Sequence, residues 1–92
     1  MLKISRQTKF KRDSKRLIRS GKFSKSDEKE LLNVIECLAM GKQLDKKYRD
    51  HGLTSNWTNH RECHIKPDLL LIYKIHGDSI KLVRLGSHSD LF

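Results

Sequence analysis

Hydrophobic and polar positions follow two different periodicities at the start of the chain, and each periodicity predicts one secondary-structure element. Residues Leu2–Ser5 alternate apolar with polar, which is typical of a short strand. From Thr8 to Ser20 the spacing becomes helical, and Gly21 is well suited to end that helix. The apolar face of this predicted helix carries Phe10, Leu17 and Ile18.

A second helix is predicted between Ser24 and Gly41. Ser24 followed by Asp27 matches a capping box, which satisfies free backbone N–H groups where a helix begins. Apolar residues then recur every three or four positions: Leu31, Leu32, Val34, Ile35, Leu38 and Ala39. Gly41 is expected to end this helix. Since a short segment joins the two helices, we expect a helical hairpin whose apolar faces pack on a sheet.

The periodicity is lost from Lys42 to Thr58, where we expect a long surface loop. Three strands are predicted after it: Asn59–Ile65, Asp68–His76 and Ser79–Leu85. Turns at Lys66-Pro67-Asp68 and Gly77-Asp78 would join them as an antiparallel meander. The middle strand is apolar on both faces, as expected of a strand that is covered on both sides.

These elements predict one α+β domain over residues 1–92. Its order is strand-helix-helix-strand-strand-strand, with the helical hairpin packed on a mainly antiparallel four-stranded sheet. A chain of 92 residues can bury one modest core and seldom divides into two domains.

Charge narrows the range of partners. Twenty Lys and Arg against eleven Asp and Glu give a net charge of +9, which favours an anionic partner such as nucleic acid. We predict RNA-binding roles for basic residues of the first helix and the later chain: Lys9, Lys11, Arg12, Lys15, Arg16, Arg19, Lys47, Arg49 and Arg61. For the helix, a solvated face without a ligand is the competing interpretation.

Other classes of protein are disfavoured. No apolar stretch approaches the ~18 residues of a membrane helix, and the N-terminus lacks the apolar segment of a signal peptide, so we expect a cytoplasmic protein. Cys37 and Cys63 are expected to be buried free thiols. A zinc site built from Cys63, His64 and His88 is not expected because adjacent ligands rarely reach one metal. We therefore predict no metal and no cofactor.

Candidate chemistry gathers at the strand ends of the last third of the chain. His64 and Asp68 flank one turn of the predicted meander, and Arg84 and His88 end its last strand. Antiparallel pairing returns that end to the same edge of the sheet, and His51 in the long loop could reach it. Competing interpretations are that Asp68 only forms the turn and that Arg84 pairs with Glu62.

This set of residue types suits RNA cleavage without a metal. The 2′-hydroxyl needs a base, the departing 5′-oxygen needs an acid and the phosphorane needs a cation. Histidine titrates near neutrality and can act as either acid or base. Arginine presents a permanently charged fork to phosphoryl oxygens. His60 and His76 are interpreted as surface residues, and Trp57 as an anchor for the loop.

Two motifs add a family resemblance. R-x-x-H-x-x-P-D spans Arg61 to Asp68, and R-x-G-x-H-x-x-L-F spans Arg84 to Phe92. Together with Tyr48-Arg49-Asp50-His51, Trp57 and the Leu69–Tyr73 run, they resemble the YafQ-like branch of the RelE/ParE toxin superfamily. Some relatives have an aromatic residue where this chain has Leu69, which puts a stacking role there in doubt.

The resemblance implies a toxin of a type II toxin–antitoxin module that cleaves mRNA on the ribosome without a metal. It implies an active-site set of His51, His64, Asp68, Arg84, His88 and Phe92. His88 would be the general acid and Arg84 would steady the phosphate. His64, His51 or Asp68 would be the general base or its orienting partner. Phe92 would help to position a base of the RNA or the catalytic histidine.

The resemblance also implies a cognate antitoxin that covers the basic site. Two other functions compete with the nuclease: a non-catalytic nucleic-acid-binding or repressor module, and a ParE-type toxin that inhibits gyrase. The histidines favour the nuclease over the gyrase inhibitor, which needs none.

Overall fold

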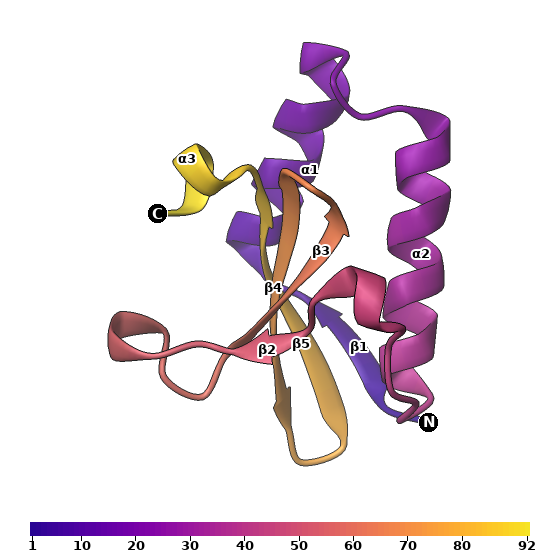
Figure 1. The fold of residues 1–92 in the computed structure, drawn as a ribbon, viewed down its shortest axis with the longest axis vertical. Helices are drawn as coiled ribbons and strands as arrows, with labels where there is room; N and C mark the ends of the chain where they lie inside the picture. Colours follow the sequence, from indigo (N-terminus) through magenta and orange to yellow (C-terminus); the bar gives the residue numbers. More distant parts are fainter.

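Strand β4 (Leu69–His76) is the centre of the sheet because its first five residues are buried on both faces. The computed structural model describes residues 1–92 and places the strands in the order β1-β5-β4-β3-β2. Strand β1 runs parallel to β5, and the other neighbours are antiparallel. The predicted α+β architecture is therefore confirmed (Figure 1).

The remaining elements follow the sequence closely. They are β1 (Lys3–Arg6), α1 (Thr8–Ser20), α2 (Lys25–Ala39), β2 (His51–Gly52), β3 (Arg61–Lys66), β5 (Ser79–Gly86) and α3 (His88–Leu91). Single-turn 3-10 helices lie at Lys46–Tyr48 and Ser55–Trp57.

The helix ends form as their residues dictate. The Ser24 side chain accepts from the Asp27 N–H, and the Asp27 side chain accepts from the Ser24 N–H, so the predicted capping box is present. Gly21 ends α1 in the left-handed region with φ 74°, a conformation that costs glycine little. Ile18 and Leu32 are 61% and 57% exposed, because each lies one residue beyond a core position and points away from the sheet.

The main core lies between the helices and one face of the sheet. Its members include Phe10, Leu17, Val34, Ile35, Leu38, Leu71, Tyr73, Ile80, Leu82 and Leu85. The opposite face carries a smaller apolar cluster of Leu70, Ile72 and Leu91, with Leu53, Trp57 and Val83 packed against it. We call this the open face. In Figure 1, α2 lies to the right of the sheet, whereas α3 and the segment after β2 lie to its left.

Three predictions about the fold are wrong in detail. The sheet has five strands instead of four, because residues 51–52 of the expected loop pair with Arg61 and Glu62. Strand β3 begins at Arg61, since Asn59 has a positive φ of 71° that cannot continue a strand. Cys37 is only half-buried, whereas Cys63 is buried as expected. None of the helices has the length and apolar character needed to cross a membrane.

Candidate active site

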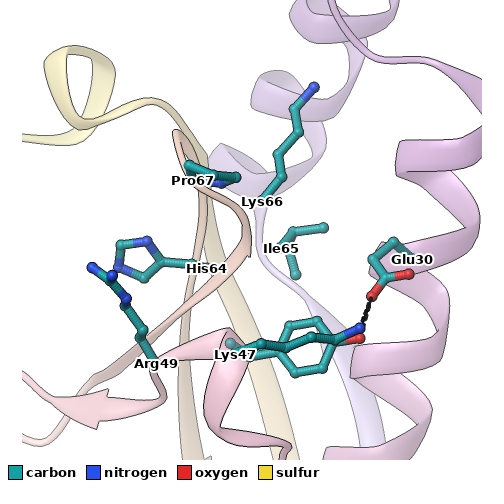
Figure 2. A pocket seen from close by; sticks show the side chains of 8 residues that line it. Glu30, Lys47, Arg49, His64, Ile65, Lys66 and Pro67 are labelled. Carbon is teal, nitrogen blue, oxygen red and sulfur yellow. Dashed lines mark hydrogen bonds and ion pairs between the residues drawn. The ribbon is translucent and has the colours of Figure 1, made fainter.

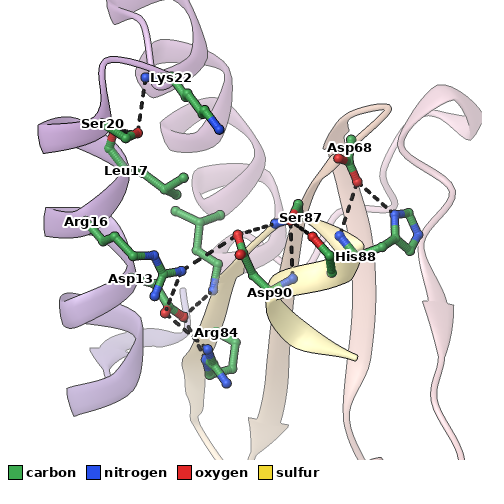
Figure 3. A network of polar contacts seen from close by, with 12 residues as sticks. Asp13, Arg16, Leu17, Ser20, Lys22, Asp68, Arg84, Ser87, His88 and Asp90 are labelled. Atoms are coloured by element: carbon green, nitrogen blue, oxygen red, sulfur yellow. Dashed lines mark hydrogen bonds and ion pairs between the residues drawn. The ribbon is translucent and has the colours of Figure 1, made fainter.

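His88 begins the short helix α3, and Asp68 holds it there. Asp68 Oδ1 accepts from the His88 backbone N–H at 3.1 Å and lies 3.0 Å from His88 Nδ1 (Figure 3). These two contacts, the side-chain one foremost, hold the pKa of Asp68 below its usual value. A second capping box, between Ser87 and Asp90, fixes the start of α3. The turn after β3 and the end of β5 are thus joined through one carboxylate.

Glu62 lies between the other two histidines of the site. Its Oε1 is 3.4 Å from His64 Nε2 and 3.6 Å from His51 Nε2, and the residue is only 4% exposed. His51 Nδ1 lies 2.6 Å from the carbonyl oxygen of Arg49. A buried carboxylate between two imidazoles favours a proton on the nitrogens that face it.

The imidazole rings form one row over the end of the sheet. The ring centroids of His64 and His88 are 5.7 Å apart, and those of His51 and His64 are 6.3 Å apart. The register explains this proximity, since Leu70 of β4 pairs with both His64 and Gly86. The structure therefore brings together His51, His64, Asp68 and His88 from among the candidates.

Arg84 is held by α1 and makes no contact with the histidines. Its Nε and Nη2 donate to the two carboxylate oxygens of Asp13 at 2.7 and 3.2 Å (Figure 3). Asp13 also accepts the backbone N–H of Leu85, an edge group that β1 is too short to pair. The hydrogen bonds that the Arg84 side chain donates to Asp13 are the main reason that the pKa of Arg84 is raised. Arg84 therefore pairs with Asp13 and not with Glu62.

Phe92 lies against the loop and not against a histidine. Its ring meets Trp57 edge to face at 6.3 Å, and Trp57 meets His60 in the same way at 5.3 Å. Trp57 also packs on the open-face cluster, so the expectation of a loop anchor agrees with its contacts. The Phe92 side chain remains largely exposed beside this pair.

A cavity of about 430 Å³ adjoins His64 (Figure 2). Its cations are Lys47, Arg49 and Lys66. Lys47 lies 4.0 Å from Glu30, and Lys66 lies 2.8 Å from Asp27. Tyr48 donates to Glu30, and this hydrogen bond raises the pKa of Tyr48 to about 12. The Arg49 guanidinium forms no ion pair, and in Figure 2 it lies beside the His64 ring.

The other basic residues predicted to bind RNA differ in whether their side chains already form ion pairs. The side chains of Lys9, Lys11, Arg12, Lys15 and Arg19 are exposed and form no ion pairs. Arg16 is engaged, because its Nη2 lies 3.2 Å from Asp13 and 3.8 Å from Asp90. Arg61 is engaged as well, at 3.3 Å from Asp50.

Sequence reasoning missed Glu62 as a site residue. The signal was present, because residues two apart on a strand share a face and Glu62 therefore points with His64. One ligand atom each from Glu62, His64 and His88 lie within 4.8 Å of one another, a set that could hold a metal ion. This trio differs from the zinc set considered above, because Cys63 faces the core.

The family model described as "Bacterial toxin of type II toxin-antitoxin system, YafQ" matches residues 2–92. A "Putative toxin YafQ" of Haemophilus influenzae is 35% identical over 93 residues, covering 97% of this chain and 90% of the relative. An "mRNA interferase toxin YafQ" of Escherichia coli is 42% identical over 49 residues, 53% of each chain.

Solved structures agree along the whole length. A metal-bound toxin from Helicobacter pylori has a TM-score of 0.89 and 46% identity, with both chains fully covered. The toxin chain in the E. coli DinJ-YafQ complex has a TM-score of 0.85 and 29% identity, covering 100% of this chain and 99% of that one.

Proposed function

Because the chain belongs to the YafQ family of type II toxin–antitoxin toxins, we propose that it is an endoribonuclease that cleaves mRNA. The observation that carries this proposal is the row of three imidazoles and the two carboxylates that contact them. Glu62 lies beside His51 and His64, and Asp68 lies beside His88. The reaction is attack of a 2′-hydroxyl on the adjacent phosphorus, without a metal. Its products are a 2′,3′-cyclic phosphate and a 5′-hydroxyl.

His64 is the general base in this proposal. Glu62 faces its Nε2, which leaves the lone pair on Nδ1 free to accept a proton. Both nitrogens of His51, in contrast, face acceptors. His64 therefore removes the proton of the 2′-hydroxyl as the O2′–P bond forms, while His51 holds Glu62 in place.

His88 is the general acid. Asp68 accepts from Nδ1, so Nε2 of the imidazolium carries the second proton and donates it to O5′ as the P–O5′ bond breaks. The His64 and His88 rings meet edge to face with their centroids 5.7 Å apart, so one phosphodiester group lying across this pair can reach both the base and the acid.

Two arginines supply the cation for the phosphorane. Asp13 occupies Nε and Nη2 of Arg84, which leaves Nη1 available for a phosphoryl oxygen. Arg49 lies beside His64 with its whole guanidinium unpaired, so it is the better-placed partner for the developing charge. Phe92, next to Trp57, would position a nucleobase of the RNA beside the scissile bond.

Replacing His88 tests the chemistry directly. His88→Ala should lower the cleavage rate by about 10²–10⁴-fold, the usual contribution of a positioned proton donor, with RNA binding little changed. The substrate is mRNA in the presence of a chelator, with and without ribosomes, and the product ends are identified.

The matched control is His76→Ala, an exposed histidine at the far end of β4, which should retain full activity. A fully active His88→Ala protein would remove the assignment. Cleavage only when ribosomes are present would support action on the ribosome, and intact RNA in both arms would leave a binding role.

The module partner is proposed to be an antitoxin. The E. coli relative is complexed with DinJ, and a net charge of +9 suits a partner with acidic segments. The gyrase-inhibitor alternative has no use for the histidine row.

We propose further that a transition-metal ion inhibits the enzyme at Glu62, His64 and His88. These ligand atoms lie within 4.8 Å of one another, and a metal there would engage Glu62 and fix the two imidazoles that the reaction needs free. Added Cu²⁺ should lower the cleavage rate, and a chelator should restore it. A rate that falls in chelator would instead show that the metal takes part in the reaction.

A further inference from the structure

The open face continues away from the histidines into a groove bordered by lysines. Strands β4 and β5 place Lys74 directly opposite Lys81, and α1 adds Lys9. The groove measures about 400 Å³, and its other lining residues are Gln7, Thr8, His60 and Val83. Lys74 and Lys81 are half-buried, so their charges lie close to the sheet instead of extending freely into solvent.

This arrangement of charge opposes folding. Side chains directly opposite on antiparallel strands lie about 4.5–5.5 Å apart at Cβ, and like charges there are destabilising. Lys9, Lys74 and Lys81 form no ion pair, whereas Lys3 and Lys66, on other strands of the sheet, are paired with Asp78 and Asp27. A bound anion would offset the repulsion, and no residue of the chain provides one.

An aromatic pair connects this groove with the catalytic residues. Phe92 ends the helix that begins at His88, and its ring meets Trp57 at 6.3 Å. The other neighbour of Trp57 is His60, at 5.3 Å, which lines the groove. Aromatic rings followed by a cationic groove are how proteins bind single-stranded nucleic acid, with bases stacked and phosphates paired.

We propose that the groove formed by Lys9, Lys74 and Lys81 binds the phosphodiester backbone of RNA, at a distance from the bond that is cleaved. This inference rests on the proposed function for the identity of the ligand. Ammonium groups contact phosphates as point charges and do not read bases, so the contribution to affinity is independent of sequence.

The test measures binding separately from cleavage. A fully 2′-O-methylated RNA oligonucleotide binds but cannot be cleaved, because it has no free 2′-hydroxyl. Its affinity is measured from low to physiological salt for the wild type and for Lys74→Ala/Lys81→Ala. Each lost phosphate contact should reduce the slope of log affinity against log salt by about 0.7.

The control is Lys25→Ala/Lys29→Ala. It removes the same charge from exposed, unpaired positions on α2, on the opposite side of the sheet. A second arm uses vacant ribosomes. A smaller slope on the oligonucleotide would assign the groove to the substrate strand, and a smaller slope only on ribosomes would assign it to ribosomal RNA. Equal slopes for the two double variants in both arms would overturn the proposal.

Two further measurements keep the inference distinct from the function proposed above. Lys74→Ala/Lys81→Ala should raise KM for mRNA while kcat at saturation is unchanged, and its melting temperature should equal or exceed that of the wild type, since a repulsion is removed. A wild-type protein that binds the oligonucleotide with the full slope but never cleaves mRNA would contradict the nuclease and still support the groove. A melting temperature well below wild type would contradict the repulsion argument.

Discussion

Asp68 controls how His88 is presented, although it touches no reacting atom in the proposed mechanism. Its carboxylate accepts the backbone N–H of His88 at 3.1 Å and lies 3.0 Å from the ring nitrogen Nδ1. Because Asp68 is exposed, this contact does not strengthen the core. Its effect on His88 is orientation: it holds Nδ1, so that Nε2 faces the substrate.

Asp68→Asn should therefore lower kcat by about 10–100-fold, part of the 10²–10⁴-fold that a positioned proton donor contributes, with KM little changed. The measurement is single-turnover cleavage of mRNA by the purified protein. Asp78→Asn, in the hairpin at the far end of the sheet, is the matched control and should behave as wild type. An unchanged kcat for Asp68→Asn would reduce Asp68 to a turn former, the alternative that the sequence left open.

At the scale of elements, the segment from Lys46 to Gly52 depends on tertiary anchors because it has little regular structure of its own. Tyr48 donates to Glu30 of α2, and the Tyr73 hydroxyl donates to Asp50 Oδ1 at 2.6 Å. Burial and the Asp50 carboxylate raise the pKa of Tyr73, so its phenol stays a donor at neutral pH. Asp50 precedes His51, and the second anchor thus sets where His51 meets Glu62.

Tyr73→Phe should cost about 1 kcal/mol in the free energy of unfolding, the net contribution of one hydrogen bond, because the buried ring is kept. Amide hydrogen exchange should accelerate from residue 49 to residue 53 and stay unchanged in β4. Exchange rates that are the same in Tyr73→Phe and in the wild type at every residue would show that Asp50 does not hold the segment.

At the scale of the whole molecule, carboxylates at the ends of elements make stability depend on pH. The pKa values of Asp27, Asp68 and Asp90 are lowered, chiefly by hydrogen bonds to Lys66, His88 and Ser87. A folded pKa below the unfolded one stabilises the protein above the unfolded value, and that stability is lost as pH falls through the folded value. Protonation also adds positive charge to a chain that already carries +9.

The free energy of unfolding should therefore decrease as pH falls below about 4, the ordinary pKa of aspartate. Urea denaturation at a series of pH values measures it. Asp27→Asn should be less stable at neutral pH and should lose less stability in acid. A wild type with the same stability at pH 3 and pH 7 would contradict this account.

The sequence by itself determined what short-range physics controls. Apolar spacing predicted α1, α2 and a central strand β4 that is covered on both faces, and the Ser24–Asp27 pattern predicted a capping box. These features depend on residues within a few positions of one another. Hairpin geometry also placed the ends of β3 and β5 at one edge of the sheet, and the structure brings His64, Asp68 and His88 together there.

The tertiary structure alone decided the partners of the charged groups. Asp13 accepts hydrogen bonds from Arg84, which is 71 positions away in the sequence. The contact forms because β1 is short and the uncovered edge of β5 packs against α1. The periodicity of the sequence does not reveal this packing. Glu62 is a site residue because the segment after α2 pairs with β3 and places His51 beside it. The fold brings Lys9 to the groove beside Lys74 and Lys81 in the same way. Long-range contacts of single side chains depend on where whole elements pack, and that position is a property of the folded molecule.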